Sequence, residues 1–127
     1  MGDITMILAG LTERIIACAI EVHKELGPGL LESVYESALI IELFQQGIHF
    51  HRQKQLPVQY KGEHVGDFRV DLIVEDTVVV ELKSVEHHDP VFEAQLLTYM
   101  KLGGYNVGLL INFNSLLLTK GVKRLML

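Results

Sequence analysis

The chain has 127 residues, of which 49% are hydrophobic and 7% aromatic, and its formal net charge is −5 at pH 7. This length fits one domain over residues 1–127 with a core of its own, and the composition excludes a disordered chain. The acidic balance argues against a protein that holds nucleic acid mainly by long-range attraction. The longest uncharged run near the N-terminus, residues 4–12, is too short for a membrane span, so we expect a cytoplasmic protein with no membrane partner.

Two helices are predicted before any strand. Residues 3–26 start with Asp3 as a capping residue and carry apolar side chains at three- and four-residue spacing, until Gly27-Pro28-Gly29 breaks the pattern. A second helix is predicted over residues 30–46, with Gly47 as its stop. Its expected buried stripe consists of Leu31, Val34, Ala38, Ile41 and Phe44.

Three extended segments follow the helices. Residues 48–60 lead through a turn at Lys61-Gly62 into a long strand over residues 65–75. A further turn at residues 75–77 precedes the β-branched run 78–83. That run is apolar until Glu81 and Lys83, two residues of opposite charge at alternate positions. Charged residues in an otherwise apolar strand need an explanation.

The rest of the chain supplies one more helix and at least one more strand. A helix over residues 89–102 begins with Asp-Pro and ends at Gly103-Gly104, and residues 105–111 form an apolar strand. The segments 116–118 and 122–127 can add one or two short edge strands. The predicted order is α-α-β-β-β-α-β, an α/β fold with a mixed central sheet flanked by helices.

Paired carboxylates are the candidate chemical feature. If the loop between the second and third strands is the three residues 75–77, Asp71 lies directly opposite Glu81. Opposed Cβ atoms are about 4.5–5.5 Å apart, and like charges at that distance destabilise a sheet unless a cation lies between them. Alternation puts Lys83 on the face of Glu81 and Arg69 on the side of Asp71. A two-residue loop would shift the pairing by one position.

A divalent cation between the two carboxylates would compensate their repulsion. Oxygen ligands suit Mg²⁺ or Mn²⁺, and these ions activate water for attack on phosphodiesters while a lysine stabilises the transition state. A bound cation would also offset part of the negative charge of the chain. The alternative is an ion pair between Glu81 and Lys83, or between Asp71 and Arg69, on a solvated sheet face.

The same residues carry a family resemblance. Asp71 followed by Glu81-Leu82-Lys83 resembles the D…(D/E)xK signature of the PD-(D/E)XK nuclease superfamily, whose core has the order α-β-β-β-α-β. The segment Gly29-Leu30-Leu31-Glu32-Ser33-Val34-Tyr35 resembles the motif after which the GxxExxY protein family is named. The resemblance continues through Arg69-Val70-Asp71-Leu72, Glu93-Ala94-Gln95-Leu96-Leu97-Thr98-Tyr99 and Gly108-Leu109-Leu110-Ile111-Asn112-Phe113, so it spans nearly the whole chain.

The resemblance implies a role for each residue of the constellation. Asp71 and Glu81 match the metal ligands, the main-chain carbonyl of Leu82 is the candidate third ligand, and Lys83 matches the catalytic lysine. Glu32 matches the acidic helix residue that many members point at the metal. Without the resemblance, Glu32 would be read as a carboxylate that interacts with the dipole at a helix N-terminus.

Other polar residues have weaker implied roles. Gln95 and Tyr99 resemble the Gln-x-x-x-Tyr pair of RecB-type and lambda-exonuclease-like members, which lines the site, and their spacing of four puts them on one helix face. They could instead form a helix stripe that hydrogen-bonds the sheet. His23 resembles the upstream histidine of RecB-type nucleases, an auxiliary ligand or phosphate contact. His49 and His51 alternate on one strand face beside basic residues, which favours a solvated edge over a metal site.

These observations leave three functions open. The first is a metal-dependent nuclease that hydrolyses phosphodiester bonds of DNA or RNA. The second is a catalytically inactive module of the same fold that binds nucleic acid or a protein partner, which the small size and negative charge favour. The third is a metal hydrolase that acts on a small phosphoester. A chain this small rarely encloses a polynucleotide alone, so we expect a homodimer formed through the C-terminal strands or the first helix.

Overall fold

The computed structural model describes residues 4–127, so Asp3, the predicted cap of the first helix, lies outside the described residues. Within this part of the chain, no helix combines the length and the apolar character needed to cross a membrane. The elements in chain order are α1 (Ile4–Leu26), α2 (Glu32–Gln45), β1 (Phe50–Tyr60), β2 (Glu63–Val74), β3 (Val78–Lys83), α3 (Pro90–Gly103), β4 (Val107–Asn112), the short 3₁₀ helix η1 (Leu118–Gly121) and β5 (Val122–Met126).

The sequence predicted this α/β order, with one difference near the C-terminus. The possible strand at residues 116–118 is wrong, because the chain forms a loop and η1 there, and only the segment from Val122 adds a strand. Asp89 caps α3 by accepting a hydrogen bond from the Val91 N–H at 3.0 Å, as its place before Pro90 predicted. Gly104 ends that helix in a left-handed conformation.

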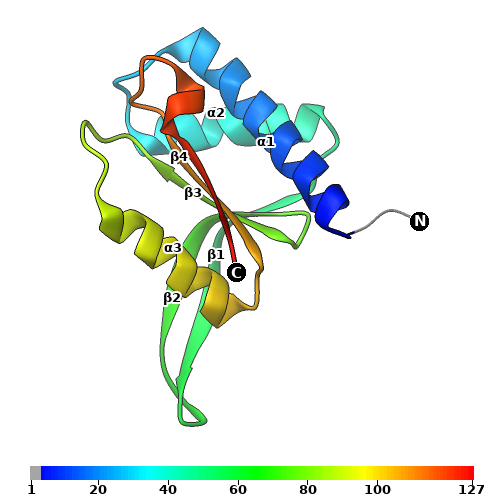
Figure 1. Cartoon of the computed structure of the whole chain (residues 1–127), viewed down its shortest axis with the longest axis vertical. Coiled ribbons are helices and arrows are strands. Elements are labelled where there is room, and N and C mark those ends of the chain that lie inside the picture. Colours follow the sequence, from blue (N-terminus) through cyan, green and yellow to red (C-terminus); the bar gives the residue numbers. More distant parts are fainter. Residues whose placement is uncertain (1–3) are drawn as a thin grey trace.

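The strands form one mixed sheet in the order β1-β2-β3-β4-β5. The β3–β4 pair is parallel and the other three pairs are antiparallel. One hydrophobic cluster joins α1 and α2 to one face of the sheet, and a smaller one joins α3 to the other face. The mixed sheet flanked by helices is therefore confirmed, and Figure 1 shows α1 and α2 at one end of the molecule with the tip of the β1–β2 hairpin at the other.

The buried face of α2 differs from the predicted stripe. Leu31 and Phe44 are 73% and 78% exposed, whereas Tyr35, Leu39 and Leu43 are fully buried. The ring of Tyr35 stacks on Phe113 with centroids 4.4 Å apart, and the helix is rotated to satisfy this packing. The stripe prediction is wrong because apolar spacing alone cannot report where a buried aromatic ring finds its partner.

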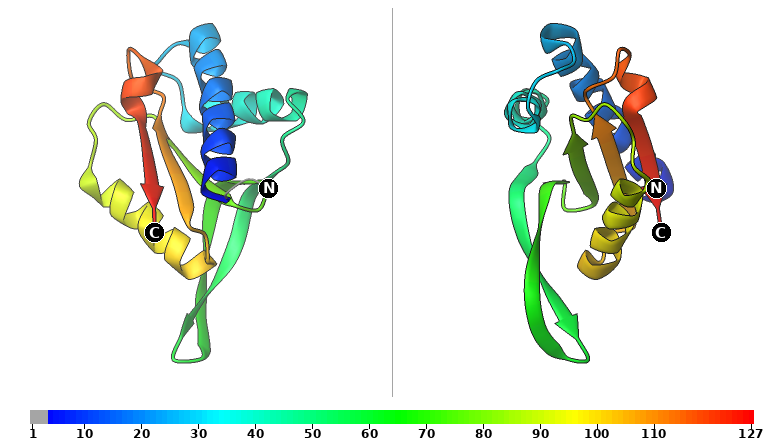
Figure 2. Two further views of the ribbon diagram at one scale, coloured as in Figure 1. Left: turned by 45° about the vertical axis from the view of Figure 1, so that its right-hand side comes forward. Right: turned by 90° about the vertical axis from the view of Figure 1, so that its left-hand side faces the viewer.

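Strand β2 bends where the candidate site begins. Its pairing with β3 ends at Leu72 and Val80, and beyond that point the β1–β2 hairpin projects away from the rest of the sheet (Figures 1 and 2). Val70 packs with Ile73 in the cluster under α3, whereas Leu72 packs under α1 and α2. Side-chain alternation therefore breaks at Asp71, and the bend opens a space between two neighbouring strands.

Candidate metal centre

The turn at residues 75–77 has the predicted three-residue length, because Val74 pairs with Val78. This register brings Asp71 and Glu81 together at the point where β2 leaves β3. The Asp71 N–H donates to Oε1 of Glu81 at 2.9 Å, and the Leu82 N–H donates to Oδ2 of Asp71 at 2.9 Å. The two carboxylates thus replace the main-chain carbonyls that would continue the β2–β3 pairing.

A cavity of about 310 Å³ opens at this point. Five of the residues that the sequence singled out line it together: Glu32, Asp71, Glu81, Leu82 and Lys83. The remaining lining residues are Ser33, Glu36 and Gln53. Side chains or main chain from α2, β1, β2 and β3 therefore meet in one acidic cavity, which we call the carboxylate cavity.

The carboxylate cavity stabilises the protonated forms of Glu32, Asp71 and Glu81. Glu81 is 7% exposed, and burial together with the negative charge of Asp71 raises the pKa of its carboxyl group to about 8. Burial also raises the pKa of Asp71 and that of Glu32, while the positive charge of Lys83 acts in the opposite direction on all three groups. Four carboxyl groups, those of Glu32, Glu36, Asp71 and Glu81, thus line the cavity with one lysine, and a bound cation would stabilise their charged forms.

Lys83 stands beside the carboxylates in a fixed position. Its Nζ lies 4.5 Å from the centroid of the Phe92 ring, a cation–π contact between β3 and α3. Arg69, which the alternation placed on the side of Asp71, is exposed and does not line the cavity.

Gln95 and Tyr99 lie on α3, outside the lining of the carboxylate cavity. The Tyr99 ring stacks on Phe68 at 4.8 Å. Burial raises the pKa of the Tyr99 hydroxyl, and the negative charge of Glu81 raises it further, so this hydroxyl lies within electrostatic reach of the site. Gln95 is exposed. The structure brings Tyr99 towards the carboxylates and leaves Gln95 at the surface.

Glu36 and Gln53 contribute to the cavity although the sequence analysis did not identify them. Glu36 is 6% exposed, and its two oxygens accept hydrogen bonds from Arg52 Nε at 2.7 Å and Gln53 Nε2 at 2.6 Å. Gln53 Nε2 also lies 3.3 Å from Oδ1 of Asp71, and its backbone has a left-handed φ of 53°. No local pattern signals this chain of contacts, because it joins a helix to two strands.

A network of hydrogen bonds fixes the start of α2 at the cavity. The buried Tyr35 hydroxyl donates to the Gly27 carbonyl at 2.5 Å and accepts from the Leu30 N–H at 3.1 Å. Ser84, which directly follows β3, donates from Oγ to the Leu30 carbonyl at 2.5 Å. The loop between α1 and α2 is thus tied both to its own helix and to the end of β3, and Glu32 begins α2 beside the carboxylate pair.

The histidines have partners elsewhere. His23 Nε2 lies 2.7 Å from the Ser115 carbonyl oxygen, where it joins α1 to the loop after β4. His51 Nε2 lies 3.2 Å from Oδ1 of Asp76 at an exposed position. Neither histidine lines the carboxylate cavity.

The donor set fits a hydrated divalent cation. Within residues 4–127, no three His, Cys, Asp or Glu side chains are grouped closely enough to hold a metal ion by themselves. Mg²⁺ is commonly bound through one or two carboxylates and keeps several waters, so two acidic side chains suffice for it. Asp71 and Glu81 supply that pair, Leu82 lies between Glu81 and Lys83, and Glu32 lies across the same cavity.

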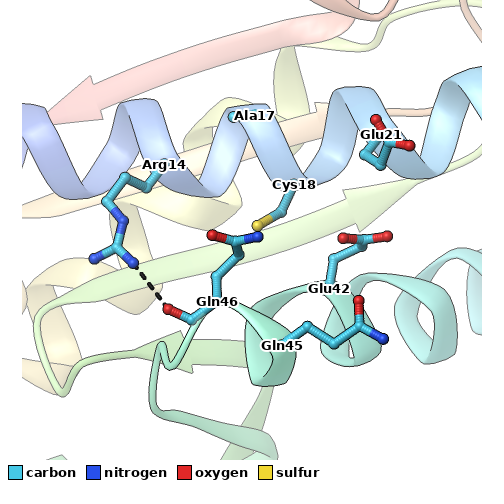
Figure 3. A pocket seen from close by; sticks show the side chains of 7 residues that line it. All are labelled: Arg14, Ala17, Cys18, Glu21, Glu42, Gln45 and Gln46. Atoms are coloured by element: carbon cyan, nitrogen blue, oxygen red, sulfur yellow. Dashed lines mark hydrogen bonds between the residues drawn. The ribbon is translucent and has the colours of Figure 1, made fainter.

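A larger cavity of about 470 Å³ between α1 and α2 is lined by two carboxylates, Glu21 and Glu42, but by none of the residues that the sequence analysis proposed for the site (Figure 3). Arg14 crosses it and donates to the Gln46 carbonyl at 3.0 Å. Cys18 is 5% exposed, and burial followed by the negative charge of Glu42 raises the pKa of its thiol. The thiol is therefore a poor nucleophile.

Comparison with known proteins identifies the family. The family model described as the PD-(D/E)XK nuclease superfamily matches residues 9–125. Searches of the curated proteins and of the solved structures found no match to the chain. The matched segment contains every element from β1 to β4, both halves of the Asp71–Glu81 pair, and Lys83. The chain belongs to the PD-(D/E)XK nuclease superfamily.

Proposed function

We propose that this chain is a Mg²⁺- or Mn²⁺-dependent nuclease that hydrolyses phosphodiester bonds of DNA or RNA. Members of the superfamily generally use divalent metal ions. The observation that carries the proposal is the pair formed by buried Glu81 and half-buried Asp71, joined through the backbone N–H of Asp71 and placed beside Lys83 in one cavity. A purely structural sheet would gain nothing from two opposed acids whose charges repel each other.

Each residue of the carboxylate cavity has a proposed task. Asp71 and Glu81, with the Leu82 carbonyl, would hold the cation, which supplies positive charge that activates water and offsets charge on the phosphate. Lys83, held against Phe92, would donate a hydrogen bond to a phosphate oxygen as negative charge develops there. Glu32, across the cavity, would orient water through its carboxylate.

The two residues of α3 do not line the carboxylate cavity, and their proposed roles rest on their position near it. Tyr99 lies near enough to the carboxylates for their charge to act on its hydroxyl, so we propose that it contacts the substrate next to the reacting phosphate. Gln95, exposed one turn earlier, would contact nucleic acid that extends along α3.

We also propose membership of the GxxExxY family within the superfamily. Each of the three motif residues has a distinct structural task. Gly29 has a φ of 97°, Glu32 enters the carboxylate cavity, and Tyr35 anchors the loop before α2. The spacing of the motif thus places a glycine in the loop, a carboxylate at the cavity and a tyrosine in the core.

A substrate panel tests the proposed function. Labelled single- and double-stranded DNA and RNA would each be incubated with the purified chain in Mg²⁺, in Mn²⁺ or in a chelator. We expect cleavage of at least one substrate class with metal and none with the chelator. Intact substrates in every metal condition would contradict the proposal and favour the inactive, binding form of the fold.

A further inference from the structure

A second cavity adjoins the carboxylate cavity and shares Lys83 with it. Its volume is about 200 Å³, enough for a phosphate group together with water molecules. We call it the basic cavity. Its lining includes Lys83, His88, Phe92, Asn114, Lys120 and Lys123.

The basic cavity concentrates positive charge in an acidic protein. Lys83, Lys120 and Lys123 line it, and the one carboxylate among the lining residues is that of Glu86, which is exposed. The whole chain carries a net charge of −5. Three lysines around one small cavity are therefore a local reversal of the overall charge, and such a place attracts an anion.

Two loops that form the walls are held together by one side chain. Asn112, at the end of β4, accepts hydrogen bonds at Oδ1 from the Val85 and Asn114 N–H groups, each at 3.1 Å. Its Nδ2 donates to the Val85 carbonyl at 3.0 Å. The segment after β3 and the segment after β4 are thus fixed relative to each other, so the cavity exists before any ligand arrives.

Gly121 lets η1 pack closely against the end of β4 at the remaining wall. It lines the cavity, and a Cβ atom at this position would collide with the Asn112 carbonyl oxygen and come within 2.5 Å of Ser115 Oγ. Only a glycine lets η1 approach the end of β4 so closely. The backbone therefore carries Lys120 and Lys123 to the rim on both sides of this contact.

The lysines differ in how far they are already engaged. Lys123 Nζ lies 3.4 Å from Oε1 of Glu93, the same oxygen that His88 Nε2 contacts at 2.9 Å. Lys120 is exposed and makes no ion pair with any residue in the described part of the chain. Lys83 is held over the Phe92 ring. Lys120 is thus the lysine of this cavity with no ion pair among the described residues, and an added anion would supply one.

We propose that the basic cavity binds a phosphate group of the polynucleotide, next to the phosphate that reacts in the carboxylate cavity. This inference rests on the proposed nuclease function, because Lys83 joins the two cavities. The group is either a neighbouring phosphodiester of a continuing strand or a terminal phosphate. Phosphate oxygens are the acceptors that clustered lysines bind, and such contacts fix the register of a strand without reading its sequence.

The test measures binding without cleavage. Labelled single-stranded oligonucleotides of one sequence, with either a 5′-phosphate or a 5′-hydroxyl, would be titrated with protein in a chelator over a series of salt concentrations that starts low, and their fluorescence anisotropy recorded. The variant is Lys120→Gln/Lys123→Gln. The matched control is Lys61→Gln/Lys101→Gln, which makes the same charge change at the hairpin tip and at the end of α3.

We expect the basic-cavity variant to weaken binding about 10-fold and to lower the slope of log affinity against log salt by about one. The control should change binding less than 3-fold. A preference for the 5′-phosphate that the variant loses would identify a terminal phosphate, whereas equal weakening of both oligonucleotides would identify an internal phosphodiester.

Unchanged binding in the variant, or equal weakening by the control, would overturn the basic cavity as a phosphate site. This outcome is separate from failure of the nuclease function, because the titration needs no turnover. A chain that cuts nucleic acid but binds it equally well without Lys120 and Lys123 would keep the first proposal and refute this one.

Discussion

For Glu81, an energetic cost of burial accompanies the metal-binding role that we propose. Its carboxylate is 7% exposed, and its neighbour across the strands is another acid, Asp71. Burial and this neighbour raise the pKa of Glu81 to about 8, so the protein without metal favours the neutral form. A divalent cation bound by the two side chains, as we propose, would reverse this preference, because it would stabilise their charged forms.

The raised pKa of Glu81 predicts how stability depends on pH in metal-free protein. The folded chain keeps this proton up to about pH 8, whereas the unfolded chain loses it near 4.5. The folded state thus binds more protons between these values, so the free energy of unfolding should fall as pH rises through that range. Thermal unfolding in a chelator from pH 4.5 to 8.5 measures it.

Glu81→Gln should remove this contribution to the pH dependence. At pH 8.5 the variant should unfold at a higher temperature than the wild type, and at pH 4.5 the two should be similar. Glu25→Gln, which changes an exposed acid on α1, is the matched control and should follow the wild-type profile. A Glu81→Gln profile that parallels the wild type would show that Glu81 does not titrate in this range.

Residues close in the chain could be placed from the sequence, and residues joined only by tertiary contact could not. Asp71 and Glu81 lie on one hairpin, so the length of a single turn was enough to put them opposite each other. Glu36 and Gln53 are separated by 17 positions and meet through the packing of α2 on β1. No periodicity or turn signal encodes that contact, and the bend at Asp71 that opens the cavity is equally non-local.

At the scale of elements, the start of α2 is set by its loop. Tyr35 is fully buried, and its hydroxyl bonds two backbone groups of the preceding loop. The residue spacing predicted a helix here, but the rotation of α2 depends on this hydroxyl and on the stacking of its ring on Phe113. Local apolar periodicity predicted the opposite face, which the structure leaves exposed.

Tyr35→Phe tests the anchor. Loss of the hydroxyl leaves the Leu30 N–H and the Gly27 carbonyl without this partner, so the free energy of unfolding should fall by about 1–3 kcal/mol. Chemical denaturation measures it. Tyr60→Phe is the matched control, because it deletes the same atom from a ring that is 62% exposed, and it should change stability by less than about 0.5 kcal/mol. Equal effects would refute the anchor.

At the scale of the whole molecule, the order of helices and strands was predictable because turns and breakers mark each boundary. The order also allows the parallel β3–β4 pair, since parallel neighbours need a crossover connection and α3 supplies it. The surface was less predictable. Apolar side chains remain exposed at the start of α1, on α2 and at the end of β5, including Ile7 at 56%, Phe44 at 78% and Met126 at 58%.

The sequence analysis offered the C-terminal strands or the first helix as the surface of a homodimer, and we propose a dimer that uses both, through the start of α1 and the end of β5. Leu8 and Ala9 of α1 share a small apolar cavity with Val107 and Met126, so these segments form one continuous surface. Light scattering should give twice the 14.3 kDa of the chain, and Ile7→Glu should give the monomer mass. A wild type that is monomeric at every concentration would contradict the prediction.

The cleavage rate of the wild type against Lys83→Ala tests the account most directly, on whichever nucleic acid the wild type cuts with Mg²⁺ or Mn²⁺. Lys101→Ala, purified in parallel, removes a lysine from the exposed end of α3 and controls for loss of charge and for contaminating nucleases. We predict a loss of about 100-fold or more in Lys83→Ala, with the fold retained, and a wild-type rate in Lys101→Ala. Full turnover by Lys83→Ala would contradict a site built from Asp71, Glu81 and Lys83.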